Sequence, residues 1–125
     1  MADFHKTLRE SIEYPDQVFK CTSMFYDNPS KIEFTGSVKN GMYDGEFKWF
    51  RITGEIHSNR FYKCSQVHGE SILYNAVGVI LKHCFMLNNK RVEELDYLMN
   101  EPRDEAFYVT LALYGIDKEY IIGAK

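Results

Sequence analysis

Apolar residues return at a fixed interval of 24 positions through the middle of the chain. Ile32, Ile56 and Ile80 occupy one column when the sequence is written in rows of that length, and the three rows align without an insertion. Self-similarity at a fixed period of this size is typical of repeat architectures, in which each repeat is one supersecondary unit. The pattern therefore predicts three repeated units over residues 19–89.

Five further columns align at the same offset, and all but the Gly-Glu pair, which is Cys21-Thr22 in the first row, keep apolar or aromatic residues in every row. Agreement in this many columns at one offset is not expected from chance, so it strengthens the prediction of a repeat. One column pair is Cys21-Thr22, Gly45-Glu46 and Gly69-Glu70, a second is Phe25-Tyr26, Trp49-Phe50 and Leu73-Tyr74, and a single column is Val38, Tyr62 and Met86.

Each unit is predicted to be a β-hairpin. In the central unit, a short aromatic strand over residues 46–50 is followed by a polar turn ending at Gly54 and by a second strand over residues 55–63. Glycine supplies the positive φ that tight hairpin turns require, and Asn40-Gly41 is the strongest short hairpin signal in the chain. One hairpin is marginally stable in water, so successive hairpins should pair edge to edge in a meander.

The apolar spacing becomes helical on both sides of the repeats. Phe4, Leu8 and Ile12 lie four positions apart, which predicts an amphipathic helix that Pro15 ends. The C-terminal segment is predicted to hold a helix over residues 106–114 and a short helical turn after it. An earlier helix in the same segment is predicted from the spacing of Val92, Leu95, Leu98 and Met99. Pro102 stands where the helix after it would begin, and Gly115 is well placed as the C-terminal cap of that helix.

The predicted fold class is α+β, in one domain of 125 residues. Both faces of the predicted strands carry apolar residues, and a sheet that is apolar on both sides needs helices to cover it. We therefore expect a curved antiparallel hairpin meander, with an N-terminal helical segment over residues 1–18 and a helical C-terminal segment over residues 90–125 packed on the sheet.

One unit carries the features of a known repeat family. Residues 34–49 read FTGSVKNGMYDGEFKW, with Gly36, then Asn40-Gly41, then Gly45 before an aromatic strand. This segment resembles a MORN repeat, and its divergent neighbours are similar to the second MORN class, found in bacterial proteins labelled as antitoxins and in phage and cytoplasmic proteins. The resemblance implies a β-hairpin array that acts as a scaffold for protein or lipid contacts, and it does not imply an enzyme. The neighbouring units have Arg60 and Ser65, then Cys84 and Asn89, in place of Gly36 and Gly41.

Composition narrows the range of partners. The net charge is −3, which offers no general attraction for nucleic acids or anionic membranes. Lys82-His83 and Lys90-Arg91 give only local positive charge among acidic neighbours, so nucleic-acid and membrane binding are not expected. The three cysteines form no CxxC pair, and the N-terminus lacks the apolar run of a signal peptide, so we expect a cytoplasmic protein.

The His, Cys and Glu residues of the chain give little support for a catalytic site or a metal site. His57, Cys64 and His68 have the spacing H-x6-C-x3-H, which fits no closed metal motif, so neither a metal nor a cofactor is expected. His83 and Cys84 are adjacent and should point to opposite faces of a strand. Glu46 and Glu70 repeat in register and are therefore interpreted as structural. A small hydrolase or nuclease using His57, His68 and Glu70 is kept as an alternative.

The aromatic columns carry the functional hypothesis. Exposed Trp and Tyr are frequent anchors of protein interfaces, so the predicted partner-binding residues are Trp49, Phe50, Tyr62 and Tyr74. The predicted function is a non-catalytic module that binds and modulates a partner protein, as an antitoxin, inhibitor or adaptor does, in a bacterial or phage setting. Packing of the same aromatics under the helices, binding to a lipid surface, and homo-oligomerisation through the sheet edges are the alternatives.

Overall fold

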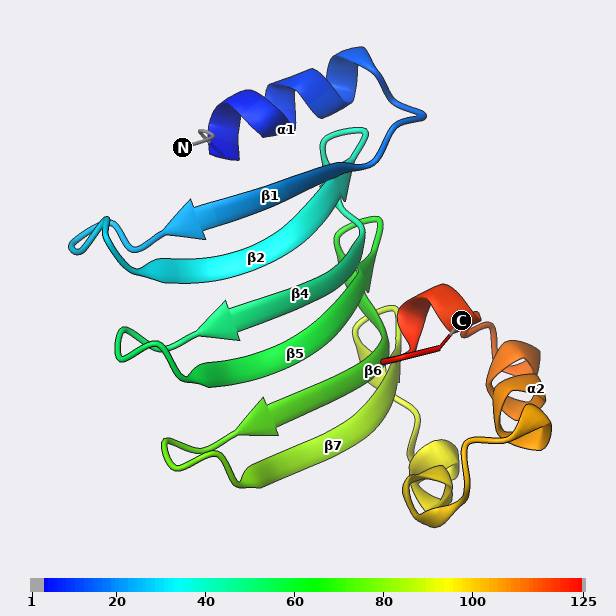
Figure 1. Ribbon diagram of the computed structural model, residues 1–125. Helices are drawn as coiled ribbons and strands as arrows, with labels where there is room; N and C mark the ends of the chain where they lie inside the picture. The colour runs from blue at the N-terminus through cyan, green and yellow to red at the C-terminus, as the bar shows by residue number, and fades with distance from the viewer. Residues whose placement is uncertain (1–3, 125) are drawn as a thin grey trace.

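The computed structural model describes residues 4–124 and has an α+β architecture, with one large antiparallel sheet and helices at both ends of the chain (Figure 1). This agrees with the predicted fold class. The elements in chain order are α1 (Phe4–Glu13), β1 (Phe19–Met24), β2 (Ile32–Lys39), β3 (Met42–Tyr43), β4 (Gly45–Phe50), β5 (Ile56–Lys63), β6 (Gln66–Tyr74), β7 (Ile80–Leu87), β8 (Lys90–Arg91), the 3-10 helix η1 (Glu93–Asn100), α2 (Glu105–Leu113) and the 3-10 helix η2 (Lys118–Tyr120).

The strands form a meander, because each strand pairs with the next one in the chain, except that β4 pairs with β2 and not with the two-residue strand β3. The order across the sheet is β1-β2-β4-β5-β6-β7-β8, with β3 paired to β2, and every pairing is antiparallel. Figure 1 shows the resulting stack of hairpins, with α1 beside β1 at one end. The predicted edge-to-edge pairing of hairpins is confirmed.

The 24-residue period is visible in the backbone of three two-residue turns. Asn40-Gly41, Cys64-Ser65 and Asn88-Asn89 are spaced by 24 positions, and all six residues have positive φ between 50° and 75°. Positive φ at both central residues is the requirement of a type I′ hairpin turn. The second and third units therefore keep the turn geometry of the first unit although they lack its glycine.

Side chains at these turns join consecutive units. The Ser65 hydroxyl accepts a hydrogen bond from the backbone N–H of Tyr43 at 3.0 Å, and Asn89 Oδ1 accepts one from the backbone N–H of Val67 at 2.7 Å. The backbone N–H groups of Ser65 and Asn89 donate in return to the carbonyls of Tyr43 and Val67. Ser65 and Asn89 thus each make a side-chain hydrogen bond that glycine could not make, which explains why they stand at the glycine position of the repeat.

The prediction that the first row aligns without an insertion is wrong. Met24 pairs with Ile32, eight positions further on, whereas Phe50 pairs with Ile56 and Tyr74 with Ile80, six positions further on. The loop of the first hairpin is therefore two residues longer, and surface loops accept such insertions at little cost. Ser23-Met24 and Phe19-Lys20 occupy the places in the sheet that the sequence alignment had given to Phe25-Tyr26 and Cys21-Thr22.

The helical flanks agree with prediction apart from the type of the first C-terminal helix and the start of the next one, which begins at Glu105 and not at Pro102. The first C-terminal helix is a 3-10 helix, η1, and α2 begins with Asp104 as its N-cap, whose side chain accepts a hydrogen bond from the N–H of Phe107 at 3.1 Å. Gly115 follows α2 with φ +93°, as a glycine C-terminal cap requires. No helix within residues 4–124 has the length and apolar character needed to cross a membrane.

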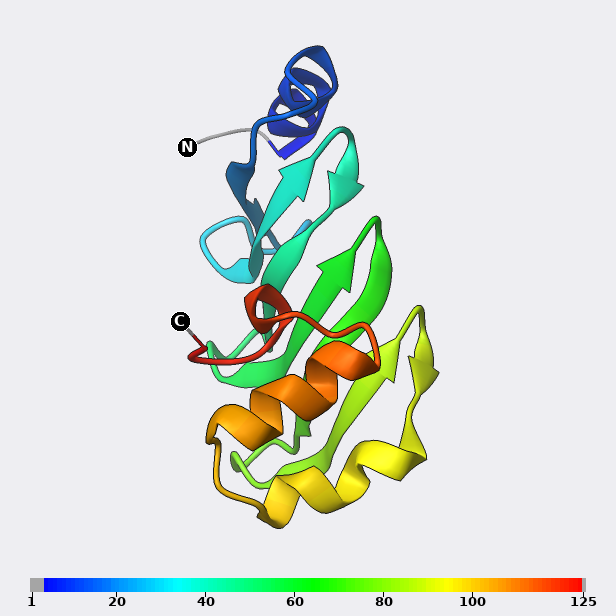
Figure 2. The ribbon, with the colours of Figure 1, turned by 90° about the vertical axis from the view of Figure 1, so that its right-hand side faces the viewer.

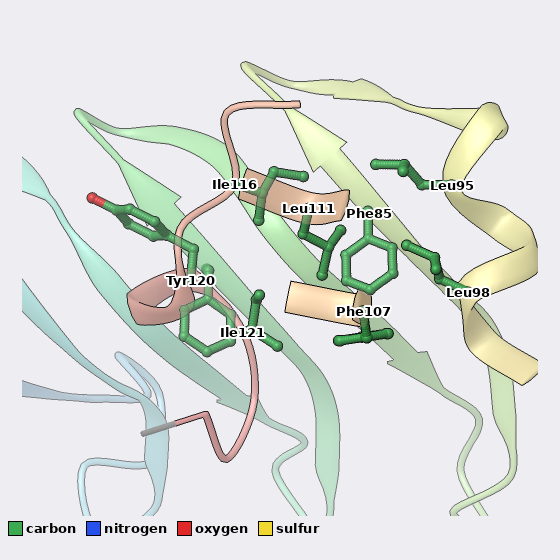
Figure 3. Packing of buried hydrophobic residues seen from close by; sticks show 9 residues of the cluster. Phe85, Leu95, Leu98, Phe107, Leu111, Ile116, Tyr120 and Ile121 are labelled. Carbon is green, nitrogen blue, oxygen red and sulfur yellow. The ribbon is translucent and has the colours of Figure 1, made fainter. Parts of the chain in front are cut away.

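The C-terminal segment packs on one face of the sheet, which we call the covered face (Figure 2). The residue at one position of the repeat shows which units the C-terminal segment covers. Ser37, Phe61 and Phe85 share one column, and the residue is apolar only in the two units that the helices reach. The buried cluster beneath the helices, drawn in Figure 3, is formed by Phe61, Phe85, Leu95, Leu98, Phe107, Leu111, Ile116, Tyr120 and Ile121.

The opposite face, which we call the open face, has a second apolar cluster. Cys21, Phe34, Val38, Phe47 and Tyr62 form its buried part, and Phe4 and Leu8 of α1 pack against it. By cross-strand pairing, the paired strand side chains of the open face are Phe19, Cys21, Ser23, Phe34, Val38, Tyr43, Phe47, Trp49, Ser58, Arg60, Tyr62, Val67, Ser71, Leu73, Lys82, Cys84, Met86 and Arg91. Glu33 and His57, the unpaired residues at the register shifts of β2 and β5, lie with these side chains around a hollow on the same face.

Candidate binding face

Three consecutive residues of β6 fasten the C-terminal segment to the covered face. His68 Nε2 lies 2.9 Å from the carbonyl oxygen of Gly115, and a Cβ added at Gly69 would lie 2.2 Å from the carbonyl oxygen of Tyr120. The absence of a side chain at Gly69 therefore lets the chain near η2 lie directly on the strand. The third residue, Glu70, is 1% exposed, and its carboxylate accepts hydrogen bonds from residues of the C-terminal segment.

The hydrogen bonds of the Glu70 carboxylate join β6 to β7 and to the C-terminal segment. Arg103 donates from Nη1 to Oε1 at 2.9 Å and from Nη2 to Oε2 at 2.6 Å, which is the bidentate geometry of a strong ion pair. His83 Nε2 lies 2.6 Å from Oε2, and the backbone N–H of Ile122 donates to Oε1 at 3.1 Å. Burial alone would raise the pKa of Glu70, but the hydrogen bonds from Arg103 and His83 outweigh it and lower the pKa from 4.5 to about 2.

The lowered pKa of Glu70 gives an expected pH dependence of stability. A depressed carboxyl pKa adds stability that is fully present above 4.5 and is lost as the pH falls towards about 2. We expect the difference in free energy of unfolding between the wild type and Glu70→Gln to shrink across this interval. Urea unfolding of both proteins at several pH values measures it, and a difference that stays constant from pH 4.5 to 2 would contradict the assignment.

The residues of the hydrolase alternative do not form a catalytic arrangement. His68 and Glu70 hold the C-terminal segment, and His57 Nδ1 lies 3.4 Å from Ser58 Oγ instead of meeting either of them. Burial, followed by the charges of Arg51 and Arg60, lowers the pKa of His57. Within residues 4–124, no group of three His, Cys, Asp or Glu side chains is placed to hold a metal ion.

Glu46 and Glu70 share a repeat position but have different surroundings. Glu46 is exposed and accepts a hydrogen bond from Asn59 Nδ2 at 3.0 Å, whereas Glu70 is buried under the C-terminal segment. A buried carboxylate that accepts a bidentate ion pair from an arginine stabilises the packing of distant segments. The structure therefore supports a structural role for Glu70, and among the residues that the structure describes its hydrogen-bond partners include no Ser, Thr or Cys side chain.

The predicted binding residues divide between the open face and its margin. Trp49 pairs with Phe34 and Ser58 on the open face, and its ring centroid lies 4.6 Å from that of Phe34. Tyr62 packs its ring edge-on against Phe47 at 5.0 Å on the same face. Phe50 and Tyr74 each follow a register shift at a strand end, next to the hairpin loops.

A hollow of 470 Å³ brings three of these four residues together. Its volume falls within the roughly 300–1,000 Å³ of ligand pockets. The carbonyl of Tyr74, the residue left out, accepts a hydrogen bond from Arg51 Nη2 at 2.9 Å. The hollow is lined by Phe25, Glu33, Trp49, Phe50, His57, Ser58, Arg60 and Tyr62.

Arg60 is the cation of this hollow, and the sequence patterns did not identify it as a binding residue. It stands in the glycine column of the repeat, opposite Phe47 on β4 and Ser71 on β6. In the first unit the same column holds Gly36, where an added Cβ would lie 2.5 Å from the ring of Phe47. The sequence shows Arg60 only as a departure from glycine, and its position at the hollow depends on the strand pairing.

No protein-family model, curated protein or solved structure matches this chain significantly. The resemblance of residues 34–49 to a MORN repeat therefore depends on the residues of that segment, and it stays a prediction.

Proposed function

We propose that this protein is a non-catalytic, MORN-like hairpin array that binds and modulates a partner protein through its open face. The observation that carries the proposal is the hollow that gathers Trp49, Phe50 and Tyr62, with Arg60 beside them. Aromatic residues and arginine are the residue types most enriched among the anchors of protein interfaces. The three I′-type turns at 24-residue spacing support the repeat part of the proposal.

The two faces differ in a way that favours this assignment. The C-terminal segment covers the apolar side chains of the covered face over the last two units. On the open face, α1 packs near β1 and β2, and half-buried aromatic side chains such as Trp49 remain in contact with solvent. An aromatic surface that the chain leaves partly unburied is typical of an interaction site.

The test compares a variant in the hollow with a matched variant outside it. Phe25→Ser removes a half-buried aromatic from the loop that borders the hollow, and Leu113→Ser removes a side chain that is 82% exposed at the end of α2. We expect Phe25→Ser to weaken partner binding by tenfold or more, about 1.4 kcal/mol, and Leu113→Ser to leave it unchanged. Affinity capture from a host lysate, followed by titration of the captured protein, measures this.

Trp49 provides a second readout of the same interaction. It is the single tryptophan of the chain, so its fluorescence reports directly on the hollow. We expect the captured partner to shift the Trp49 emission. A partner that binds Phe25→Ser as tightly as the wild type and leaves the emission unchanged would place the binding surface elsewhere.

A further inference from the structure

Within residues 4–124, the strand side chains of the open face include one carboxylate, Glu33, which stands at the register shift of β2 and lines the hollow. The whole chain has 18 Asp and Glu residues and a net charge of −3, yet the charged strand residues of this face are Glu33 and three cations, Arg60, Lys82 and Arg91. Arg91 is paired with Asp96 at 3.0 Å, which leaves Arg60 and Lys82 as the cations available to a ligand. The open face is therefore locally positive on an acidic protein.

Arg60 is the cation that lies at the hollow, and its guanidinium has no ion pair or hydrogen bond within residues 4–124. The guanidinium groups of Arg51, Arg91 and Arg103 are all bonded to other parts of the chain. Glu33 also lines the hollow, without reaching ion-pair distance of Arg60. Arg60 is half-buried on β5, the central unit's second strand, with Phe47 and Ser71 as its cross-strand neighbours.

The chemistry of this arrangement favours a carboxylate over a polyphosphate. Proteins that bind nucleic acids or anionic membranes neutralise several phosphates at once with many cations. The two unpaired cations of the open-face strands, on a chain of net charge −3, do not supply them. A guanidinium forms bidentate hydrogen bonds with one carboxylate, and the neighbouring Trp49 and Tyr62 offer apolar contact to the side chain beside it.

We infer that the open face binds an acidic segment of the partner protein, in which a carboxylate pairs with Arg60 and an adjacent apolar side chain enters the hollow beside Trp49. This inference depends on the proposed function and names the chemistry of its ligand. Arg60 is then the residue that determines specificity, and the aromatic residues supply the apolar contact.

Selection from a random-peptide display library on the immobilised protein tests the inference without knowledge of the partner. Arg60→Met removes the charge at the hollow, and Lys82→Met removes a charge from the same face outside the hollow lining. We expect the wild type and Lys82→Met to enrich peptides with Asp or Glu next to an aromatic or aliphatic residue. Arg60→Met should bind these peptides about tenfold more weakly, and Arg60→Lys should recover part of the loss. Thermal unfolding of each variant checks that it is folded.

A double-mutant cycle then assigns the contact. Replacing the Glu of an enriched peptide by Gln should weaken binding to the wild type by the same factor and should have no further effect on Arg60→Met. Binding is followed by the fluorescence of Trp49. Independent effects of the two changes would overturn the assignment of the carboxylate to Arg60.

The remaining outcomes separate this inference from the proposed function. Enriched peptides that lack acidic residues and lose affinity in Phe25→Ser would overturn the inference and leave the proposed function in place. Peptides that bind all variants equally would count against both. Binding of phosphatidylserine vesicles or single-stranded DNA that depends on Arg60, or self-association of the chain that Arg60→Met abolishes, would overturn the inference in favour of that ligand.

Discussion

Arg103→Met should lower the free energy of unfolding by about 3 kcal/mol, since it leaves a buried carboxylate without its main counter-charge. Glu70 is 1% exposed and receives two hydrogen bonds from Arg103, at 2.6 and 2.9 Å. The expected loss of stability lies at the lower end of the range for broken buried ion pairs, because the Arg103 side chain is itself 36% exposed. Urea unfolding at neutral pH, followed by tyrosine and tryptophan fluorescence, measures the change.

Two comparisons make this prediction specific to the buried charge. Arg91→Met breaks the exposed pair with Asp96, and exposed pairs contribute little, so its unfolding midpoint should stay near that of the wild type. The double variant Arg103→Met with Glu70→Gln should be more stable than Arg103→Met alone, because it removes the uncompensated charge. A double variant that is less stable than either single variant would show that the charge is not the cause.

Gly69→Ala should release the C-terminal segment from the covered face and destabilise the protein by about 2 kcal/mol more than the equivalent change at Gly45. Both glycines have φ +104° and share a repeat position, so the backbone strain of an alanine is matched. The new Cβ would meet the backbone oxygen of Tyr120 at 2.2 Å in one case and the rotatable hydroxyl of Ser37 at 2.7 Å in the other.

Amide hydrogen exchange distinguishes the local effect of Gly69→Ala from general instability. We expect faster exchange for the backbone N–H groups of residues 116–122 in Gly69→Ala, and wild-type rates for the same groups in Gly45→Ala. The hydrogen bond from the Ile122 N–H to Glu70 is the contact to watch, since it lies next to the displaced chain. Equal stability losses in the two variants would attribute the effect to backbone strain alone.

The hairpin units could be predicted because their signals are local. Asn40-Gly41 marks a tight turn by itself, and the 24-residue spacing extends that turn to Cys64-Ser65 and Asn88-Asn89. The helices were predictable for the same reason, because apolar residues four positions apart define one side of a helix. The register of β1 was not, since Phe25-Tyr26 imitates the aromatic pair Trp49-Phe50 while lying in a longer loop.

The candidate site shows where local signals end. Trp49 and Tyr62 were predictable as interface candidates from residue type and repeat position. The pairing of Glu70 with Arg103 joins residues 33 positions apart and depends on how the C-terminal segment lies on the sheet, which no spacing reveals. Arg60 was missed as well, because its surroundings on the open face come from β4 and β6 and not from its own neighbours in the chain.

The hydrogen bonds at the two-residue turns have a consequence for how such an array can change in length. Ser65 bonds back to Tyr43, Asn89 bonds back to Val67, and the N–H of Gly41 donates at 2.9 Å to the buried hydroxyl of Ser11 in α1. Helix α1 thus occupies the place of a preceding unit, and β8 and η1 contact β7 at the other end. A whole 24-residue unit inserted between the two ends would meet the same bonding pattern on both sides, so duplication or loss of units could lengthen or shorten the open face while both ends of the fold are preserved.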